Sequence, residues 1–134
     1  MTTKTDSPSR AEATAASPVV WTEIPVRDLD AAAQFYGAAL GVRLTEQQMG
    51  PDRTYVLPYG EGGVSMNLQE GPPAAPGTGP VVHFAVDEVE AAAARAATAG
   101  GQALSPVIEI PVGRMAYCAD PDGNRFGVFT FKAA

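Results

Sequence analysis

The chain has 134 residues, of which 46% are hydrophobic and 18% charged, and its formal net charge is −6 at pH 7. This composition is typical of one globular domain, and the acidic balance argues against nucleic acid as a partner because phosphate binding needs clustered Lys and Arg. No stretch approaches the ~18 uninterrupted apolar residues of a membrane span, and a single cysteine excludes an intramolecular disulfide and a cysteine-based zinc cluster, which favours a cytoplasmic location.

Residues 1–17 are polar and small and lack the apolar segment of a secretory signal. They predict a flexible N-terminal leader. The domain itself is expected to occupy residues 18–132.

The first half of the domain predicts a strand, a helix and three more strands. Val19 to Val26 is rich in β-branched residues, which favours a strand. Asp28 can accept the free amide hydrogens of a first helical turn, and Gly41 can adopt the left-handed conformation that ends a helix, so a helix is expected over 29–40. The strands that follow are expected at 42–46, 54–58 and 63–69.

The second half repeats this order after a linker. Residues 70–80, EGPPAAPGTGP, are too rich in Pro and Gly for regular structure. Beyond them the sequence predicts a strand at 81–86, a helix at 88–98, and strands at 103–108, 114–119 and 125–132.

A direct sequence repeat supports this division. PVRDLDAAA at 25–33 returns as AVDEVEAAA at 85–93, and the register continues without a gap as far as Gly63 and Gly123. A repeat at fixed spacing indicates a duplicated supersecondary unit whose apolar face is completed by its twin. We therefore expect two modules, 18–69 and 81–132, related by a pseudo-two-fold axis, with the functional site between them.

Two segments carry a resemblance to a known family. PVRDLDAAAQFYGAALG at 25–41 resembles the opening of the vicinal oxygen chelate superfamily, and ADPDGNRF at 119–126 resembles its closing hairpin. That superfamily includes glyoxalase I, extradiol dioxygenases, fosfomycin-modifying enzymes and bleomycin-binding resistance proteins. The resemblance implies an α+β fold of two βαβββ modules whose sheets form a cup-shaped half-barrel with the helices outside. It also implies a homodimer with sites where module one meets module two.

The resemblance implies four positions for a divalent metal, on the first and last strand of each module. In this chain these positions hold Trp21, Asn67, Val81 and Gly127. Only Asn67 offers a side-chain donor, and a neutral amide alone is a poor ligand. The sequence therefore predicts no metal and no other cofactor at the inherited position.

Glu23 and His83 are a second candidate pair. Side chains alternate across a strand, so Glu23 shares a face with Trp21, and His83 shares a face with Val81. The two residues are 60 positions apart, so the pseudo-dyad should bring them towards each other. Three interpretations are open: a buried hydrogen-bonded pair, recognition of a ligand's polar or cationic group, or a catalytic pair in which Glu23 orients His83 or both bind a relocated metal.

Other residues on the same strand faces complete a predicted groove. Arg125 and Phe129 are each two positions from Gly127, so they lie on the same face as Gly127. Trp21 is either a stacking surface for a ligand or a plug for the vacated metal cavity. The ligand-binding residues are expected to be Trp21, Glu23, Asn67, His83 and Arg125.

The sequence as a whole predicts a metal-free, small-molecule-binding homodimer. Its ligand would be an aromatic or cationic organic compound such as an antibiotic, held without turnover, and neither nucleic acid nor a membrane is expected as a partner. The alternative is an enzyme of glyoxalase, isomerase or dioxygenase type, which would use a relocated metal or His83 as general acid/base.

Overall fold

The computed structural model describes residues 18–60 and 63–133, so the predicted leader 1–17 lies outside the described residues. The elements follow in the order β1 (Trp21–Val26), α2 (Leu29–Leu40), β2 (Thr45–Met49), β3 (Asp52–Val56), β4 (Ser65–Glu70), β5 (Val82–Ala85), α3 (Val89–Thr98), β6 (Gln102–Ala103), β7 (Ile108–Ile110), β8 (Gly113–Ala119) and β9 (Arg125–Phe131). Within the described residues, none of the helices has the length and apolar character needed to cross a membrane.

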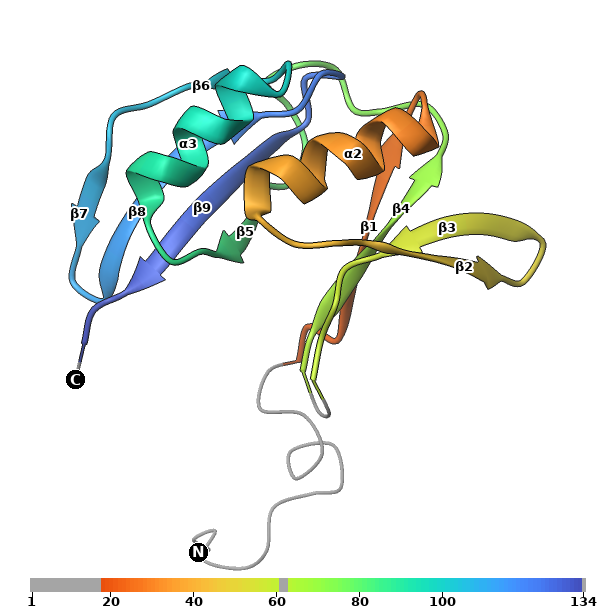
Figure 1. The fold of residues 1–134 in the computed structure, drawn as a ribbon, viewed down its shortest axis with the longest axis horizontal. Coiled ribbons are helices and arrows are strands. Elements are labelled where there is room, and N and C mark those ends of the chain that lie inside the picture. The colour runs from red at the N-terminus through yellow and green to blue at the C-terminus, as the bar shows by residue number, and fades with distance from the viewer. Residues whose placement is uncertain (1–17, 61–62, 134) are drawn as a thin grey trace, which may run out of the picture.

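Each half of the chain builds one open sheet. The first sheet has the strand order β1-β4-β3-β2, and the second has the order β5-β9-β8-β6, with β7 also paired to β8. In both sheets the first strand of the module runs parallel to the last, β1 to β4 and β5 to β9, and the other neighbours are antiparallel. Helices α2 and α3 lie side by side over the two sheets (Figure 1). The predicted α+β class with two half-barrel modules is confirmed, whereas the homodimer stays a prediction.

Two of the predicted strands differ substantially from those observed, and the bounds of the others agree to within two residues. The helix over 29–40 begins and ends as expected, with Asp28 Oδ1 accepting from the Ala31 amide and Gly41 at a φ of 70°. The amides of Gly41 and Val42 both donate to the Gly37 carbonyl, which holds the chain against the helix end, so the next strand begins at 45 and not at 42. The strand expected over 103–108 is divided into β6 and β7, because Pro106 has no amide hydrogen for the ladder.

The two modules share one hydrophobic core. Helix α2 of the first module contributes Phe35 and Tyr36, whose rings pack against Phe84 on β5 and Phe126 on β9 of the second module. The centroids of the Tyr36 and Phe126 rings are 5.3 Å apart. Separating the modules would expose this aromatic cluster to water, so the hydrophobic effect holds them together.

A buried hydrogen-bond network, which we call the inter-module clasp, fixes how the modules meet. Its members are Tyr36, Asp120, Asn124 and the carbonyl of Pro25. Tyr36 OH donates to Asp120 Oδ2 across 2.7 Å, and the Asn124 side-chain amide donates both to Asp120 Oδ2 and to the Pro25 carbonyl, each across 3.0 Å. Burial and the nearby Asp120 carboxylate raise the pKa of Tyr36 well above its ordinary value. The hydroxyl therefore stays protonated and keeps donating.

Each module has an ion pair at an equivalent place on its surface, as expected for a duplicated unit. Asp30 in the first turn of α2 pairs with Arg53 on β3 across 3.0 Å, and Glu90 in the first turn of α3 pairs with Arg114 on β8 across 2.9 Å. The hydrogen bonds from the guanidinium groups lower the pKa of both carboxyls. Because all four side chains are exposed, these pairs contribute little to the free energy of folding.

We predict that Tyr36→Phe destabilises the domain by about 1–3 kcal/mol, because it leaves the buried Asp120 carboxylate without one of its donors. Urea unfolding followed by circular dichroism measures the loss. Tyr55→Phe is the matched control, since the Tyr55 hydroxyl donates to the exposed Asp30 and its removal should leave the unfolding midpoint unchanged. Equal midpoints for the two variants would contradict the role assigned to the clasp.

Candidate functional site

The residues singled out from the sequence lie on strand faces that point away from the helices. Ile24 on β1 and Phe84 on β5 are buried in the core beneath the helices. Because side chains alternate along a strand, Trp21, Glu23 and His83 lie on the opposite face, which we call the open face of each sheet.

On the open face of the first sheet, the indole of Trp21 is hydrogen-bonded to Asn67. Trp21 Nε1 donates to Asn67 Oδ1 across 2.7 Å. Asn67 is 0% exposed, and its Nδ2 has no hydrogen-bond partner among the described residues. The indole is half-buried and lies edge-on to Tyr59, with the ring centroids 5.6 Å apart. Indole and amide together therefore fill the part of this face where the resemblance places the first two metal ligands.

The side chains at the four implied metal positions do not fit a divalent cation. Trp21 and Asn67 bind each other, and Val81 and Gly127 have no side-chain donor. A metal site needs about three or four nitrogen, oxygen or sulfur ligands at one point. Across residues 18–60 and 63–133, no three His, Cys, Asp or Glu side chains gather into a group that could hold a metal ion.

On the open face of the second sheet, His83 lies over a glycine. In the ladder β5-β9-β8, Gly127 is the Cα partner of both His83 and Tyr117. A Cβ placed on Gly127 would overlap the imidazole, so the absence of a side chain at 127 provides the space in which His83 lies. The imidazole meets the Tyr117 ring edge-on, with centroids 5.7 Å apart. Gly127 thus positions the imidazole instead of supplying a metal ligand.

His83 forms one wall of an apolar groove of about 390 Å³ on this face. The groove combines aromatic and aliphatic side chains with the imidazole, and its lining consists of His83, Ala85, Ile110, Met115, Tyr117, Phe129 and Phe131. Sequence reasoning placed His83 and Phe129 here. Alternation along β8 would also have found Met115 and Tyr117, once the register of that strand on β9 was known.

Glu23 and Arg125 lie elsewhere. Both line a separate cavity of about 210 Å³ between β1, β5, β9 and the linker, which His83 does not line. Arg125 Nη2 donates to the Gly79 carbonyl across 3.0 Å. Glu23 and His83 are both exposed and share no hydrogen bond or ion pair, so the buried Glu–His pair does not form in this chain. The single groove expected from the sequence is therefore divided, because Arg125 is held by the linker and Glu23 lies beside it.

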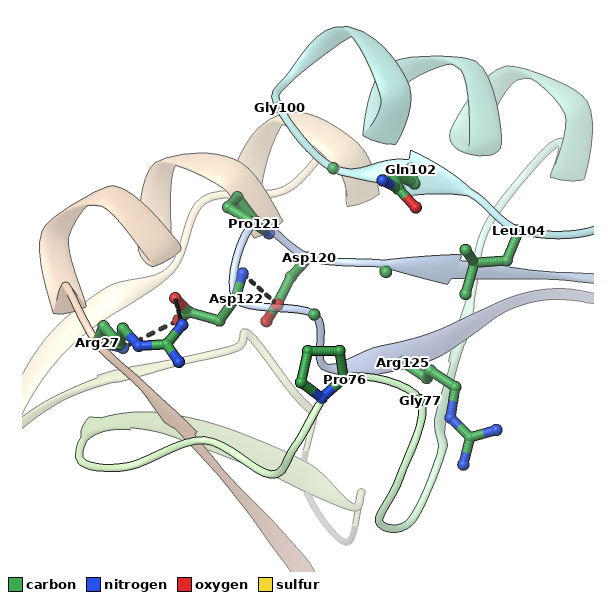
Figure 2. Close-up of a pocket in the computed structure, with 13 residues that line it drawn as sticks. Arg27, Pro76, Gly77, Gly100, Gln102, Leu104, Asp120, Pro121, Asp122 and Arg125 are labelled. Atoms are coloured by element: carbon green, nitrogen blue, oxygen red, sulfur yellow. Dashed lines mark hydrogen bonds and ion pairs between the residues drawn. The ribbon is translucent and has the colours of Figure 1, made fainter.

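A further hollow of about 530 Å³ lies beside the β8–β9 turn (Figure 2). Its wall is formed largely by turn and linker residues. Arg27 and Asp122 face each other there and are bound by two hydrogen bonds, from the Arg27 amide across 2.9 Å and from its guanidinium across 3.1 Å. Asp120 is saturated by the clasp and by turn amides. With these charges already paired, the hollow is a weaker candidate for ligand binding than the apolar groove.

Comparison with known proteins agrees with the fold. The sequence model of the Glyoxalase/Bleomycin resistance protein/Dioxygenase superfamily matches residues 19–128. Among solved structures, TnmS3, an antibiotic binding protein from Streptomyces sp. CB03234, superposes with a TM-score of 0.65 at 30% identity, covering 87% of this chain and 97% of that one.

Two curated relatives are longer proteins, and this chain matches only a part of each. The putative glyoxylase CFP32 of Mycobacterium tuberculosis is 36% identical over 112 residues, which are 82% of this chain and 42% of that protein. The anthracycline biosynthesis protein DnrV of Streptomyces peucetius is 40% identical over 79 residues, which are 58% of this chain and 26% of that protein. The chain therefore spans less than half the length of these relatives.

We predict that Gly127→Ala displaces the imidazole of His83 without unfolding the domain, because the overlapping group is an exposed side chain that can rotate. His83 is the only histidine, so its ring proton signals in NMR should shift and lose their contacts to Tyr117. In a His83→Ala background the same substitution should cost less stability than in the wild type. Unshifted ring signals would contradict this account of Gly127.

Proposed function

The chain belongs to the Glyoxalase/Bleomycin resistance protein/Dioxygenase superfamily, and we propose that it is a member that binds a small organic molecule reversibly, without a resident metal, in the groove on the second sheet. Its place of action would be the cytoplasm. The observation that carries the proposal is the groove itself, an apolar hollow with one imidazole on its wall.

The chemistry of the groove favours a flat, largely apolar ligand. Its volume of about 390 Å³ lies within the range of small-molecule sites, roughly 300–1,000 Å³. Tyr117 and Phe129 offer ring faces and edges for stacking. His83 can donate or accept one hydrogen bond, which would orient such a ligand. An aromatic compound such as an antibiotic fits these properties.

The relatives support a binding role. TnmS3 is described as an antibiotic binding protein, and it covers most of this chain. The metal positions of this chain hold a Trp–Asn pair, a valine and a glycine, which suits binding better than metal-assisted catalysis.

A second candidate is catalysis in the same groove. The observation that favours it is the exposed imidazole beside Tyr117, a pair of groups able to move a proton. In that case His83 would be the general acid/base. Glu23 would not orient it within one chain, because it lines a different cavity.

We also propose that two copies associate. Phe131 at the edge of the groove is 71% exposed, and Tyr59 on the open face of the first sheet is 56% exposed. Exposed aromatic side chains of this size favour an interface. A second copy covering these faces would enclose the groove.

We predict that Ala85→Phe weakens the binding of a planar aromatic probe about tenfold or more, because the added ring fills the groove. Anthracene-2-sulfonate is the probe and isothermal titration measures its affinity. Ala94→Phe, on the exposed side of α3, is the matched control and should leave affinity unchanged. Equal affinity of Ala85→Phe and the wild type would place the ligand outside the groove and contradict the proposal.

We predict that purified protein, dialysed after incubation with Mn²⁺, Ni²⁺ or Zn²⁺, retains much less than one metal ion per chain. The reason is the lack of ligands at the implied positions. Inductively coupled plasma analysis measures the content. A stoichiometric metal that survives dialysis would favour the enzymatic candidate over metal-free binding.

A further inference from the structure

The amide of Asn67 presents a hydrogen-bond donor that the described part of the fold leaves unused. Nδ2 has no acceptor, although the side chain is 0% exposed. A buried donor without a partner costs about 1–3 kcal/mol, and such groups are rare in folded proteins. Trp21 Nε1 is a donor only, so its 2.7 Å bond fixes Oδ1 towards the indole and leaves Nδ2 as the free end of the amide.

The neighbours of Asn67 on the sheet do not supply the missing acceptor. Its Cα partners across the ladder are Glu23 on β1 and Val56 on β3. Val56 is apolar, and the exposed carboxylate of Glu23 makes no bond to Nδ2. Two positions along β4, the Ser65 hydroxyl donates to the Leu57 carbonyl, and its oxygen accepts no hydrogen bond from Nδ2. Among the described residues, none accepts a hydrogen bond from Nδ2, and this leaves the donor available to an acceptor on a ligand.

We propose that Asn67 Nδ2 binds a carbonyl oxygen of a planar aromatic compound, at a site on the first sheet that is distinct from the groove on the second. The aromatic part of the ligand lies against Trp21 and Tyr59, whose rings meet at this point. A neutral carbonyl is preferred over a carboxylate or phosphate, because Glu23 is adjacent and the net charge of the chain is −6.

Trp21 is bound to the other end of the Asn67 amide. Nδ2 is covered, so a ligand oxygen reaches it only when the surrounding side chains shift, and a shift of the amide moves the indole that is bound to it. Trp21 is the only tryptophan in the chain. Its indole N–H signal in NMR and its fluorescence therefore report this movement directly.

The test compares two probes of the same outline, anthraquinone-2-sulfonate and anthracene-2-sulfonate, which differ in two carbonyl groups. The sulfonate is common to both, so its repulsion from the acidic protein cancels in the ratio of affinities. The wild type should bind the quinone about tenfold more tightly than the hydrocarbon, as expected for one additional buried hydrogen bond. The Trp21 indole signal should shift with the quinone and stay in place with the hydrocarbon.

Two substitutions remove the donor in different ways. Asn67→Asp keeps an acceptor for Trp21 Nε1 and loses Nδ2, and Asn67→Leu removes both ends of the amide without adding charge. The ratio of affinities should fall to about one in each variant that retains the circular dichroism spectrum of the wild type. Gln34→Glu, an amide-to-acid change on the exposed side of α2, is the matched control and should keep the wild-type ratio.

The outcomes separate this site from the groove. Discrimination between the probes that disappears in the Asn67 variants and persists in Ala85→Phe supports the site on the first sheet. Equal wild-type affinity for the two probes overturns it, even if both bind in the groove. Discrimination that survives in both Asn67 variants also overturns it.

Discussion

The hydrogen bond from Tyr36 to Asp120 is the interaction on which the arrangement of the two modules depends. It joins a helix of the first module to the β8–β9 turn of the second, inside a cluster of aromatic rings from both. Because a buried carboxylate is tolerated only where donors surround it, the turn and the helix have to meet in one geometry. That geometry sets β1 beside the linker and leaves both open faces uncovered, and it therefore determines where a ligand can bind.

The equivalent position on the last strand of each module carries a different residue. Position 67 carries an amide buried under an indole, whereas its counterpart 127 carries a glycine under an imidazole. Within each pair, one residue depends on the other. A side chain added at position 127 would displace His83. Trp21 is the only described partner of the amide oxygen of Asn67. The two equivalent places on the sheets thus differ: one holds a buried amide bonded to an indole, and the other forms the wall of an open groove.

The fold could be predicted from the sequence, because the repeat, the helix-capping residues and the turn residues are all visible as local sequence patterns. Asp28 and Gly41 placed the two ends of the helix over 29–40. The candidate site was harder, since strand parity gives the face of a residue but not its neighbours across the sheet. Parity placed Glu23 and His83 on the faces away from the helices, yet the two side chains line separate cavities, because Glu23 lies beside the linker and His83 lies beside Gly127 and Tyr117. Tyr117 was not assigned to a face from the sequence; the β8–β9 ladder places it opposite Gly127, where its ring meets the imidazole of His83.

The clasp has a consequence for assembly. It joins the modules by hydrogen bonds, and these can form in the same way whether the two modules belong to one chain or to two. Residues 71–81 alone link the two halves covalently, and they contain no strand or helix. A shortened linker would prevent Tyr36 from reaching Asp120 within one molecule, while the same bond could still form with the corresponding half of a second molecule. Exchange of halves between chains is thus available to this architecture with little change in its core.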